Sequence, residues 1–383
     1  IVGAGVAGLS MTTALADEGW KVALIDKNRF PRHKVCGEFL SPESRGFLAD
    51  LGLYQVVAEL CPSEMDKVRL TSLDGTSLDI PLNGTALGIS RYALENALLQ
   101  HIQKKGVAVH TGAKVTRVDP VEQGYQVGVR NKFGQQTLVT RAVIGAWGRT
   151  PQTILGSSLR LKPRKSWIGV KSHFVGMSTD SAVELHFFPG GYLGVSPIEK
   201  GRYNVSAVIS HKTFRHAGRT VMDAIKLAAK TNPNIAHVLG HALPIPGTQA
   251  AVTKVAPRHN VVAWGLVPHI GDAAAVIPPL CGDGMAMAIR SAALCAHLTD
   301  RFLRGEISLN DWRLQYTAML HREFARPLRW GKVVEKSLTS ATLATLLLRL
   351  GKFTPKLANR VVRETRLAGL NSSFNRDIRL KYE

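Results

Sequence analysis

The chain begins with a glycine pattern that is compatible with few folds. Gly3, Gly5 and Gly8 are spaced G-x-G-x-x-G and follow the apolar pair at positions 1–2. In this pattern the first glycine permits a tight turn, the second lets the backbone approach a pyrophosphate, and the third lets the next helix pack on a sheet. Residues 9–18 favour that helix, whose free N–H groups would face the phosphates.

An acidic residue follows the next apolar run at the distance that this pattern requires. Residues 21–25 read as a second buried strand, and Asp26 comes directly after it, 18 residues after Gly8. A carboxylate in this place accepts hydrogen bonds from a ribose diol. The glycines, the helix and the acid together predict a Rossmann site for a dinucleotide. Because the first strand is short, we expect a few residues to precede Ile1.

Length and cysteine usage favour an intracellular enzyme of two lobes. The 383 residues are enough for a large core. The four cysteines show neither a C-x-x-C pair nor a metal-ligand spacing, so we expect free thiols in a reducing cytoplasm and no metal site. No apolar run is long enough to cross a bilayer. The cysteines are Cys36, Cys61, Cys281 and Cys295.

The net charge of +21 favours an anionic partner. The chain has no nucleic-acid motif and no block of Lys and Arg, so we expect no specific nucleic-acid binding. Residues 311–383 hold 15 Lys and Arg against 6 Asp and Glu, and leucines at helical spacing lie among them, such as Leu343, Leu346 and Leu350. A basic amphipathic helix can lie on an anionic membrane surface. An acidic carrier protein is the alternative partner, and a solvated basic surface needs no partner at all.

The order of the predicted elements indicates an α/β protein. A Rossmann-like domain is expected over 1–155 and 250–310, with a hairpin over 65–85 that belongs either to it or to the second lobe. Alternating strands with one helix predict a mixed antiparallel-sheet substrate domain over 156–249. The C-terminal region, 311–383, reads as helical.

Three further motifs follow the glycine turn in a fixed order. A Lys-x-Cys-Gly segment lies in the loop after the second strand, an arginine heads a helix predicted for 91–105, and a Gly-Asp pair precedes a Pro-x-x-Gly-Asp-Gly-Met run. This series resembles the FAD-dependent group that includes p-hydroxybenzoate hydroxylase, geranylgeranyl reductases and flavin-dependent halogenases. The resemblance covers residues 1 to about 370. The motif residues are Lys34, Cys36, Gly37, Arg91, Gly271, Asp272, Pro279, Gly282, Asp283, Gly284 and Met285.

The resemblance implies FAD as the cofactor and gives individual residues a role. Asp272 would accept hydrogen bonds from the ribityl hydroxyls, Arg91 would lie near the diphosphate, and the backbone around Val115 would meet the adenine. The helix from Met285 would direct its N-terminus at the flavin pyrimidine edge, where its dipole stabilises negative charge on the reduced ring. The residues expected to bind FAD are Gly3, Gly5, Gly8, Asp26, Lys27, Arg32, Cys36, Gly37, Arg91, Val115, Gly148, Gly271, Asp272, Pro279, Gly282, Gly284 and Met285.

One motif departs from the family pattern. After the buried run at 142–146 the family carries Ala-Asp-Gly, whereas this chain carries Ala146-Trp147-Gly148-Arg149. In relatives the acid helps contacts with both flavin and nicotinamide. We therefore expect either NAD(P)H or another electron donor to reduce the flavin.

The expected catalytic residues are Cys36, Tyr192 and His173. In geranylgeranyl reductases the cysteine of Lys-x-Cys-Gly lies beside flavin and substrate, so Cys36 is expected to line the pocket, with only Lys34 near enough to activate its thiol. Tyr192 begins a segment where the reductases carry Tyr-x-Trp-x-Phe-Pro, but Gly194 and Ser196 replace the Trp and the Phe. Two missing rings predict a roomier pocket.

Two possible roles are open for each of three side chains, which are His173, His186 and Glu38. A pocket-facing His173 or His186 could deprotonate a phenol, although an outer-face position is favoured for both histidines. Period-2 alternation places Lys171 with His173 and Glu184 with His186. Glu38 is either an acid or base near the ring or a capping residue, and capping is favoured.

These features favour two reactions. The altered aromatic segment favours a monooxygenase that hydroxylates an aromatic or lipophilic small molecule through a flavin C4a-hydroperoxide. The Lys-x-Cys-Gly motif favours the alternative, a geranylgeranyl reductase-like enzyme that reduces a carbon–carbon double bond. A halogenase is disfavoured because no Trp-x-Trp occurs, and Trp147 is the sole support for a non-catalytic flavin-binding module.

Overall fold

The glycine turn lies where a narrow parallel layer meets its first helix. Strand β1 (Ala23–Asp26) pairs in parallel with β5 (Ala108–Thr111). Single bridges extend the layer, because Val2 pairs with Ile25 and Gly145, and Gly145 pairs with His269. The computed structural model describes residues 1–149, 167–258, 260–338 and 340–367.

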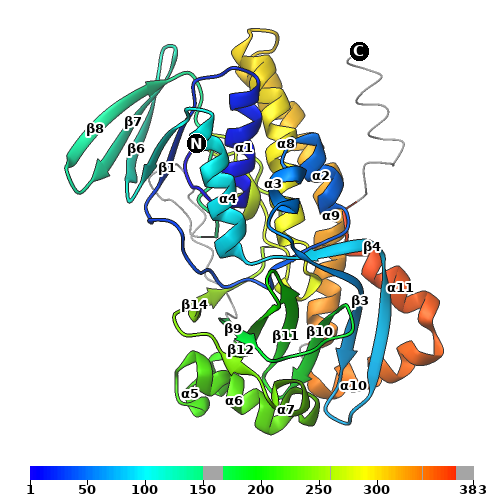
Figure 1. The fold of residues 1–383 in the computed structure, drawn as a ribbon. Helices are drawn as coiled ribbons and strands as arrows, with labels where there is room; N and C mark the ends of the chain where they lie inside the picture. The colour runs from blue at the N-terminus through cyan, green and yellow to red at the C-terminus, as the bar shows by residue number, and fades with distance from the viewer. Residues whose placement is uncertain (150–166, 259, 339, 368–383) are drawn as a thin grey trace.

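Helices and a small meander complete the first lobe. Helix α1 starts at Val6, earlier than predicted, because the glycine turn leads directly into it, and it packs on α8 and α4 (Figure 1). The apolar core of this lobe lies among these helices. The elements are α1 (Val6–Asp17), α2 (Ser44–Asp50), α3 (Tyr54–Ala58), α4 (Arg91–Lys104), α8 (Gly284–Leu303), the short η2 (Gly271–Ala273) and η3 (Pro279–Cys281), and the meander β6 (Lys114–Val121), β7 (Gly124–Asn131) and β8 (Gly134–Thr140).

A second sheet of nine strands forms the other lobe. Its order is β13-β9-β12-β11-β10-β3-β4-β2, and β14 also pairs with β9. The predicted hairpin joins this sheet, because β3 pairs in parallel with β10. The strands are β2 (Phe39–Leu40), β3 (Ser63–Thr71), β4 (Ser77–Gly88), β9 (Trp167–Val175), β10 (Ala182–Phe188), β11 (Gly191–Ile198), β12 (Arg202–Ser210), β13 (Leu243–Pro244) and β14 (Ala250–Val255).

Short helices cover one face of the large sheet. Helix α6 (Val221–Thr231) begins at Thr220, whose hydroxyl accepts a hydrogen bond from the Asp223 N–H. Its apolar face packs on β9, β11 and β12, and α5 (His211–Ala217) and α7 (Pro233–Leu239) lie beside it (Figure 1). The opposite face of the sheet is turned toward the first lobe (Figure 1).

Three helices form the C-terminal region as far as residue 367, where the described residues end. Helix α9 (Leu309–Leu338) packs along α8, and α10 (Ala341–Phe353) and α11 (Pro355–Glu364) lie next to β3 and β4 at the edge of the molecule (Figure 1). The predicted start of the substrate domain at 156 and residues 368–383 lie outside the described residues. No helix in the described ranges is both long and apolar enough to span a membrane.

Candidate functional site

A cavity of about 500 Å³ lies between the two lobes. Every residue predicted to bind FAD lines it except Gly8, which lies beneath the turn. Of the three expected catalytic residues, Cys36 and Tyr192 line the cavity and His173 does not. The motifs from both halves of the chain therefore meet at one place.

The three glycines of the opening turn have different structural roles. A Cβ on Gly8 would lie 1.8 Å from the Gly3 carbonyl oxygen, and one on Gly3 would lie 2.3 Å from the Ala146 oxygen. A Cβ on Gly5 would meet only side-chain atoms, at 3.8 Å or more. Gly3 and Gly8 thus permit backbone contacts, whereas Gly5 leaves open space at the N-terminus of α1.

The acid after β1 supports the turn from the other side. The Asp26 Oδ2 atom accepts a hydrogen bond of 2.8 Å from the Ala4 N–H, and Arg32 lies 3.5 Å from the same oxygen. Asn28 donates to Oδ1 through its backbone N–H. The carboxylate is thereby fixed at the cavity edge, where the ribose was predicted.

Two cations stand over the space that Gly5 leaves open. Both Arg91 and Lys34 have a nitrogen within 3.9 Å of the position of a Cβ on Gly5. Burial and the charge of Arg91 lower the pKa of Lys34. Burial opposes the charge of Arg91 too, but the contact with Glu95 outweighs it and raises the pKa of Arg91. The Arg91 Nε atom is buried with no hydrogen-bond partner among the described residues.

This group of charges fits a diphosphate. One carboxylate, Glu95, faces two cations, so the cluster keeps an excess of positive charge beside the N-terminal amides of α1. Anions bind well where free backbone N–H groups and basic side chains converge. The residues present therefore suit FAD, and Lys34 lines the same space although the predicted set omitted it.

The Gly-Asp pair lies opposite this turn. Gly271 has a φ of +60°, and its N–H donates to the Ser291 hydroxyl over 2.8 Å. The Asp272 carboxylate lines the cavity and accepts a hydrogen bond of 2.9 Å from the Arg149 Nε atom. Arg149, which follows the altered Ala-Trp-Gly segment, thus balances the acid that is predicted to bind the ribityl chain. The sequence signal for this ion pair was the replacement of the family's Ala-Asp-Gly segment, which brings Arg149 into this place.

Trp147 fills a space beneath the parallel layer. Its ring lies edge-on to His269 at 5.0 Å, and a Cβ on Gly145 would lie 2.3 Å from it. The indole packs with the meander core. The residue that replaces the family acid therefore has a packing role, and it also lines the cavity.

The Pro-x-x-Gly run leads into α8 as predicted from the motif. Gly282 has a φ of +72°, and α8 starts at Gly284. Asp283 is buried beside this start and accepts hydrogen bonds from the Ser41 hydroxyl and the Leu367 N–H. Burial raises the pKa of Asp283 to about 7. The helix N-terminus faces the cavity at the position expected for the flavin ring.

The Lys-x-Cys-Gly loop is held by the large sheet. Asn204 donates a hydrogen bond of 3.0 Å to the Cys36 carbonyl, and the Ser196 hydroxyl donates one of 2.9 Å to the Gly37 carbonyl. The side chain of Arg91 also reaches the Cys36 thiol. The expectation that Lys34 alone lies near this thiol is therefore wrong, because α4 brings Arg91 against the same loop.

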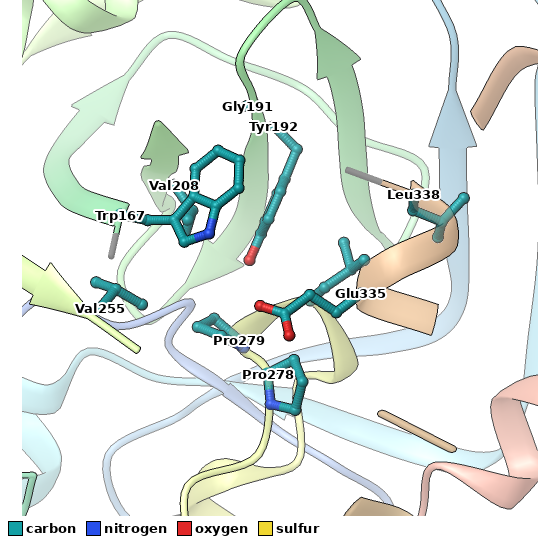
Figure 2. A pocket seen from close by; sticks show the side chains of 10 residues that line it. Trp167, Gly191, Tyr192, Val208, Val255, Pro278, Pro279, Glu335 and Leu338 are labelled. Carbon is teal, nitrogen blue, oxygen red and sulfur yellow. The ribbon is translucent and has the colours of Figure 1, made fainter. Parts of the chain in front are cut away.

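Tyr192 closes the cavity on the side of α9. Burial raises the pKa of its hydroxyl, which has no hydrogen-bond partner among the described residues. Figure 2 shows this hydroxyl pointing toward the carboxylate of Glu335, beside the ring of Trp167. These residues line a small apolar pocket of about 20 Å³ that shares Tyr192 and Leu280 with the main cavity.

A buried cluster of three charged or titratable side chains lies behind the loop. The Glu38 Oε1 atom is 2.6 Å from Lys171 Nζ, and Oε2 is 2.6 Å from His173 Nε2. Lys171 Nζ is also 2.8 Å from that imidazole nitrogen. All three side chains are at most 1% exposed. Burial raises the pKa of Glu38, but the hydrogen bond from His173 and the charge of Lys171 outweigh it, so the net shift is downward.

The structure corrects the outer-face position that the sequence favoured for two histidines. The preferred outer-face position of His173 is wrong, because its imidazole is buried against Glu38, which lines the cavity. His186 is buried as well, between Thr71 and Glu184, and does not line the cavity. Glu38 does cap α4, since Oε1 accepts the Arg91 N–H, but it also holds the cluster together.

His33 connects this cluster to the cavity and to the surface. Its ring stacks on Tyr92 at 4.7 Å and lies edge-on to His173 at 5.2 Å. Burial, followed by the charges of Lys171 and His173, lowers the pKa of His33 to about 4. The imidazole is therefore neutral near pH 7, and its Nδ1 atom has no hydrogen-bond partner among the described residues.

Comparisons with known proteins identify the family of the chain. The family model described as FAD binding domain matches residues 1–310. The chain belongs to this family. It is 25% identical to menaquinone reductase of Mycolicibacterium smegmatis over 97% of this chain and 96% of the relative. It is 24% identical to digeranylgeranylglycerophospholipid reductase 2 of Methanopyrus kandleri over 88% of this chain and 85% of that one.

The fold is shared with solved flavoproteins. A flavin-dependent brominase superposes with a TM-score of 0.77 at 17% identity, covering 95% of this chain and 92% of that one. The predicted class, an FAD-dependent oxidoreductase with an α/β fold, is confirmed. Among the described residues no group of three or more His, Cys, Asp or Glu could hold a metal ion.

The glycine geometry predicts opposite effects for two similar substitutions. Gly5→Ala should leave the fold intact, because its Cβ meets no atom closer than 3.8 Å, but it should weaken FAD binding at least about tenfold by occupying the diphosphate space. Gly8→Ala should lower the melting temperature of the apoprotein, because its Cβ overlaps the Gly3 oxygen. Flavin fluorescence titration and thermal unfolding separate the two effects; equal FAD affinity in Gly5→Ala and wild type would contradict this assignment.

The pKa of His33 predicts a pH dependence of stability. The unfolded chain takes up a proton near pH 6.5 and the folded chain only near pH 4, so the free energy of unfolding falls as the pH is lowered through this window. His33→Gln should make that fall less steep. Urea unfolding at several pH values measures it, with His237→Gln, an exposed imidazole, as control. An unchanged slope in His33→Gln would show that the imidazole titrates alike in both states.

Proposed function

We propose that the protein is a monooxygenase that hydroxylates an electron-rich, phenol-type aromatic substrate with reduced FAD. The observation that supports this reaction is the buried Glu38–Lys171–His173 cluster beside the cavity, with neutral His33 at its outer end. When bound, reduced FAD supplies the electrons for oxygen activation. One oxygen atom enters the substrate, and the other leaves as water.

Hydroxylation of a phenol benefits from removal of the phenolic proton. A free phenol has a pKa of about 10, and the phenolate is much richer in electrons at the ring carbons. A nearby proton acceptor therefore favours attack by an electrophilic oxygen. General base catalysis of this kind typically contributes about 10²–10⁴-fold in rate.

The geometry of the cluster suits proton acceptance. One imidazole nitrogen, His173 Nε2, lies within hydrogen-bond distance of both Glu38 Oε2 and Lys171 Nζ. It cannot donate to the first and accept from the second at the same time. The cluster can thus hold its protons in more than one arrangement without movement of heavy atoms.

His33 offers the proton a way out. It lines the cavity, contacts His173 edge-on and stacks on Tyr92, which is 39% exposed. Because the pKa of His33 is lowered to about 4, its imidazole is neutral near pH 7 and releases to solvent any proton that it receives. We assign His33 and Glu38 to proton transfer and His173 to positioning of the Glu38 carboxylate.

The substrate space fits an aromatic molecule. Gly194 and Ser196 line the cavity where the reductases of the family carry bulky rings. Cys36 lies on the same wall, and Tyr192 closes it toward α9. Small side chains opposite the start of α8 leave room for a ring over the flavin position.

A single turnover with labelled oxygen tests this proposal. The FAD-loaded protein is reduced anaerobically with dithionite, so that the result does not depend on NAD(P)H, which stays a prediction as the natural donor. It is then mixed with ¹⁸O₂ and a panel of alkylphenols. Mass spectrometry should find one ¹⁸O atom in the hydroxylated product.

Variants of two buried histidines sharpen the test. His173→Gln should slow product formation about 10²-fold at neutral pH, because the proton acceptor loses its partner. His186→Gln, also buried but away from the cavity, should leave the rate within about threefold. Flavin reoxidation without labelled product across the panel, or equal rates in both variants, would contradict the proposed reaction or the proposed role.

The reductase is the second candidate. The Lys34-Val-Cys36-Gly37 loop lines the cavity, and the relative that matches almost the whole chain is a menaquinone reductase. In this reaction hydride passes to one carbon of a double bond, and a proton passes to the other. Anaerobic reoxidation of the reduced protein by an isoprenoid quinone or a geranylgeranyl alkene, with formation of the saturated product, would favour it.

A further inference from the structure

Helix α10 exposes an apolar face at the edge of the molecule. Ala344 and Leu348 are buried on its inner face. The outer face carries apolar side chains that are 36–85% exposed, with Phe353 the most exposed. Helix α11 continues this surface with Leu357, which is 59% exposed. The exposed set, here called the outer patch, is Leu343, Leu346, Leu347, Leu350, Phe353 and Leu357.

Cations surround the outer patch. Lys352 lies next to Phe353 on α10, and Lys356, Arg360 and Arg363 are exposed on α11. The last three lie on one face of that helix, because they are spaced i, i+4 and i+7. No acidic residue of α10 or α11 is exposed, since Glu364 is buried against Arg326.

The inner face of α10 leads toward the cavity. Ala344 and Leu348 form one apolar cluster with Phe187, and Tyr192 and Leu280 pack against it. Tyr192 and Leu280 also line both the main cavity and the small pocket of Figure 2, where Leu338 at the end of α9 forms the far wall. Packed apolar side chains therefore connect the inner face of α10 with the wall of the cavity.

We propose that the outer patch docks on an anionic lipid bilayer. Leucines and a phenylalanine suit the acyl boundary, and the flanking lysines and arginines suit anionic headgroups. Docking would bring the apolar cluster behind α10, and the cavity wall that it supports, close to the lipid. The docking itself does not depend on which reaction the site performs.

Other occupants fit the patch less well. A second copy of the chain would bring two basic surfaces together, and the net charge of +21 opposes that contact. An acidic carrier protein would satisfy the cations but would leave little reason for a phenylalanine that is 85% exposed. Insertion into the headgroup region satisfies both the apolar and the charged side chains.

Vesicle co-sedimentation of the full chain tests the proposal. Wild-type protein should sediment with vesicles of phosphatidylcholine that contain about one-third phosphatidylglycerol, and much less with phosphatidylcholine alone. Raising the salt to about 0.5 M should release most of it, because the headgroup attraction is screened. The triple variant Leu346→Glu, Leu350→Glu, Phe353→Glu should bind at least tenfold more weakly.

A matched variant controls for added negative charge. Phe133→Glu, Val139→Glu, Leu243→Glu changes three side chains that are 66–85% exposed elsewhere, and it should bind like wild type. Circular dichroism and bound flavin verify that both variants fold. Equal loss in both variants, or no binding of wild type to anionic vesicles, would overturn the proposal.

Two further outcomes would assign the patch to another partner. A dimer in solution that the α10 variant dissociates would point to a second copy, and capture by an acidic acyl carrier protein without vesicle binding would point to a protein partner. Either would overturn membrane docking. Because this assay reads binding alone, its failure differs from failure of the oxygen-labelling experiment.

Discussion

The buried carboxylate of Glu38 connects the two lobes. It accepts the Arg91 N–H at the start of α4, in the first lobe, and contacts Lys171 and His173 on β9 of the large sheet. Its backbone has a φ of +55°, a conformation that a non-glycine residue adopts only under constraint. Removing one member of a buried ion cluster leaves an unpaired charge, which typically costs about 3–5 kcal/mol. The walls of the cavity therefore depend on the same group that we assign to proton transfer.

This arrangement explains why the Lys-x-Cys-Gly loop has a fixed position although it lacks regular secondary structure. The loop from Lys34 to Gly37 lies between the glycine turn and β11, and hydrogen bonds from Asn204 and Ser196 fix its carbonyl groups. Its side chains alternate between the lobes. Lys34 faces the diphosphate space, whereas His33 faces β9. The segment from His33 to Gly37 thus lines the cavity and also contacts the large sheet.

Local patterns in the sequence were sufficient for the parts of the fold that depend on near neighbours. Alternation predicted the strands of the substrate domain, such as β9, and the glycine spacing predicted the turn before α1. The sequence did not predict strand β11, because Gly194 and Pro197 interrupt the alternation of apolar and polar residues. The buried run at 142–146 was expected as a strand but forms none. Gly145 alone in this run makes bridges, one to Val2 and one to His269, and the ring of Trp147 lies against it.

The residues of the site were predictable only where they belong to a recognised sequence motif. Glu38 and Lys171 are 133 positions apart, and Arg149 and Asp272 are 123 apart, so no spacing in the chain pairs them. Period-2 alternation did place Lys171 and His173 on one face, but it could not tell which face meets a buried acid. That choice depends on how the two lobes pack, which is a tertiary property.

The positive charge of the chain has two separate physical contexts. Inside the cavity, Lys34 and Arg91 are desolvated and exceed their one carboxylate, so their charge becomes favourable when a diphosphate binds. On α10 and α11 the cations are exposed, where each contributes little without a charged surface to meet. Their effect grows when many act together against an anionic plane and apolar side chains insert beside them. The same excess of charge therefore favours cofactor capture in one place and surface attachment in the other.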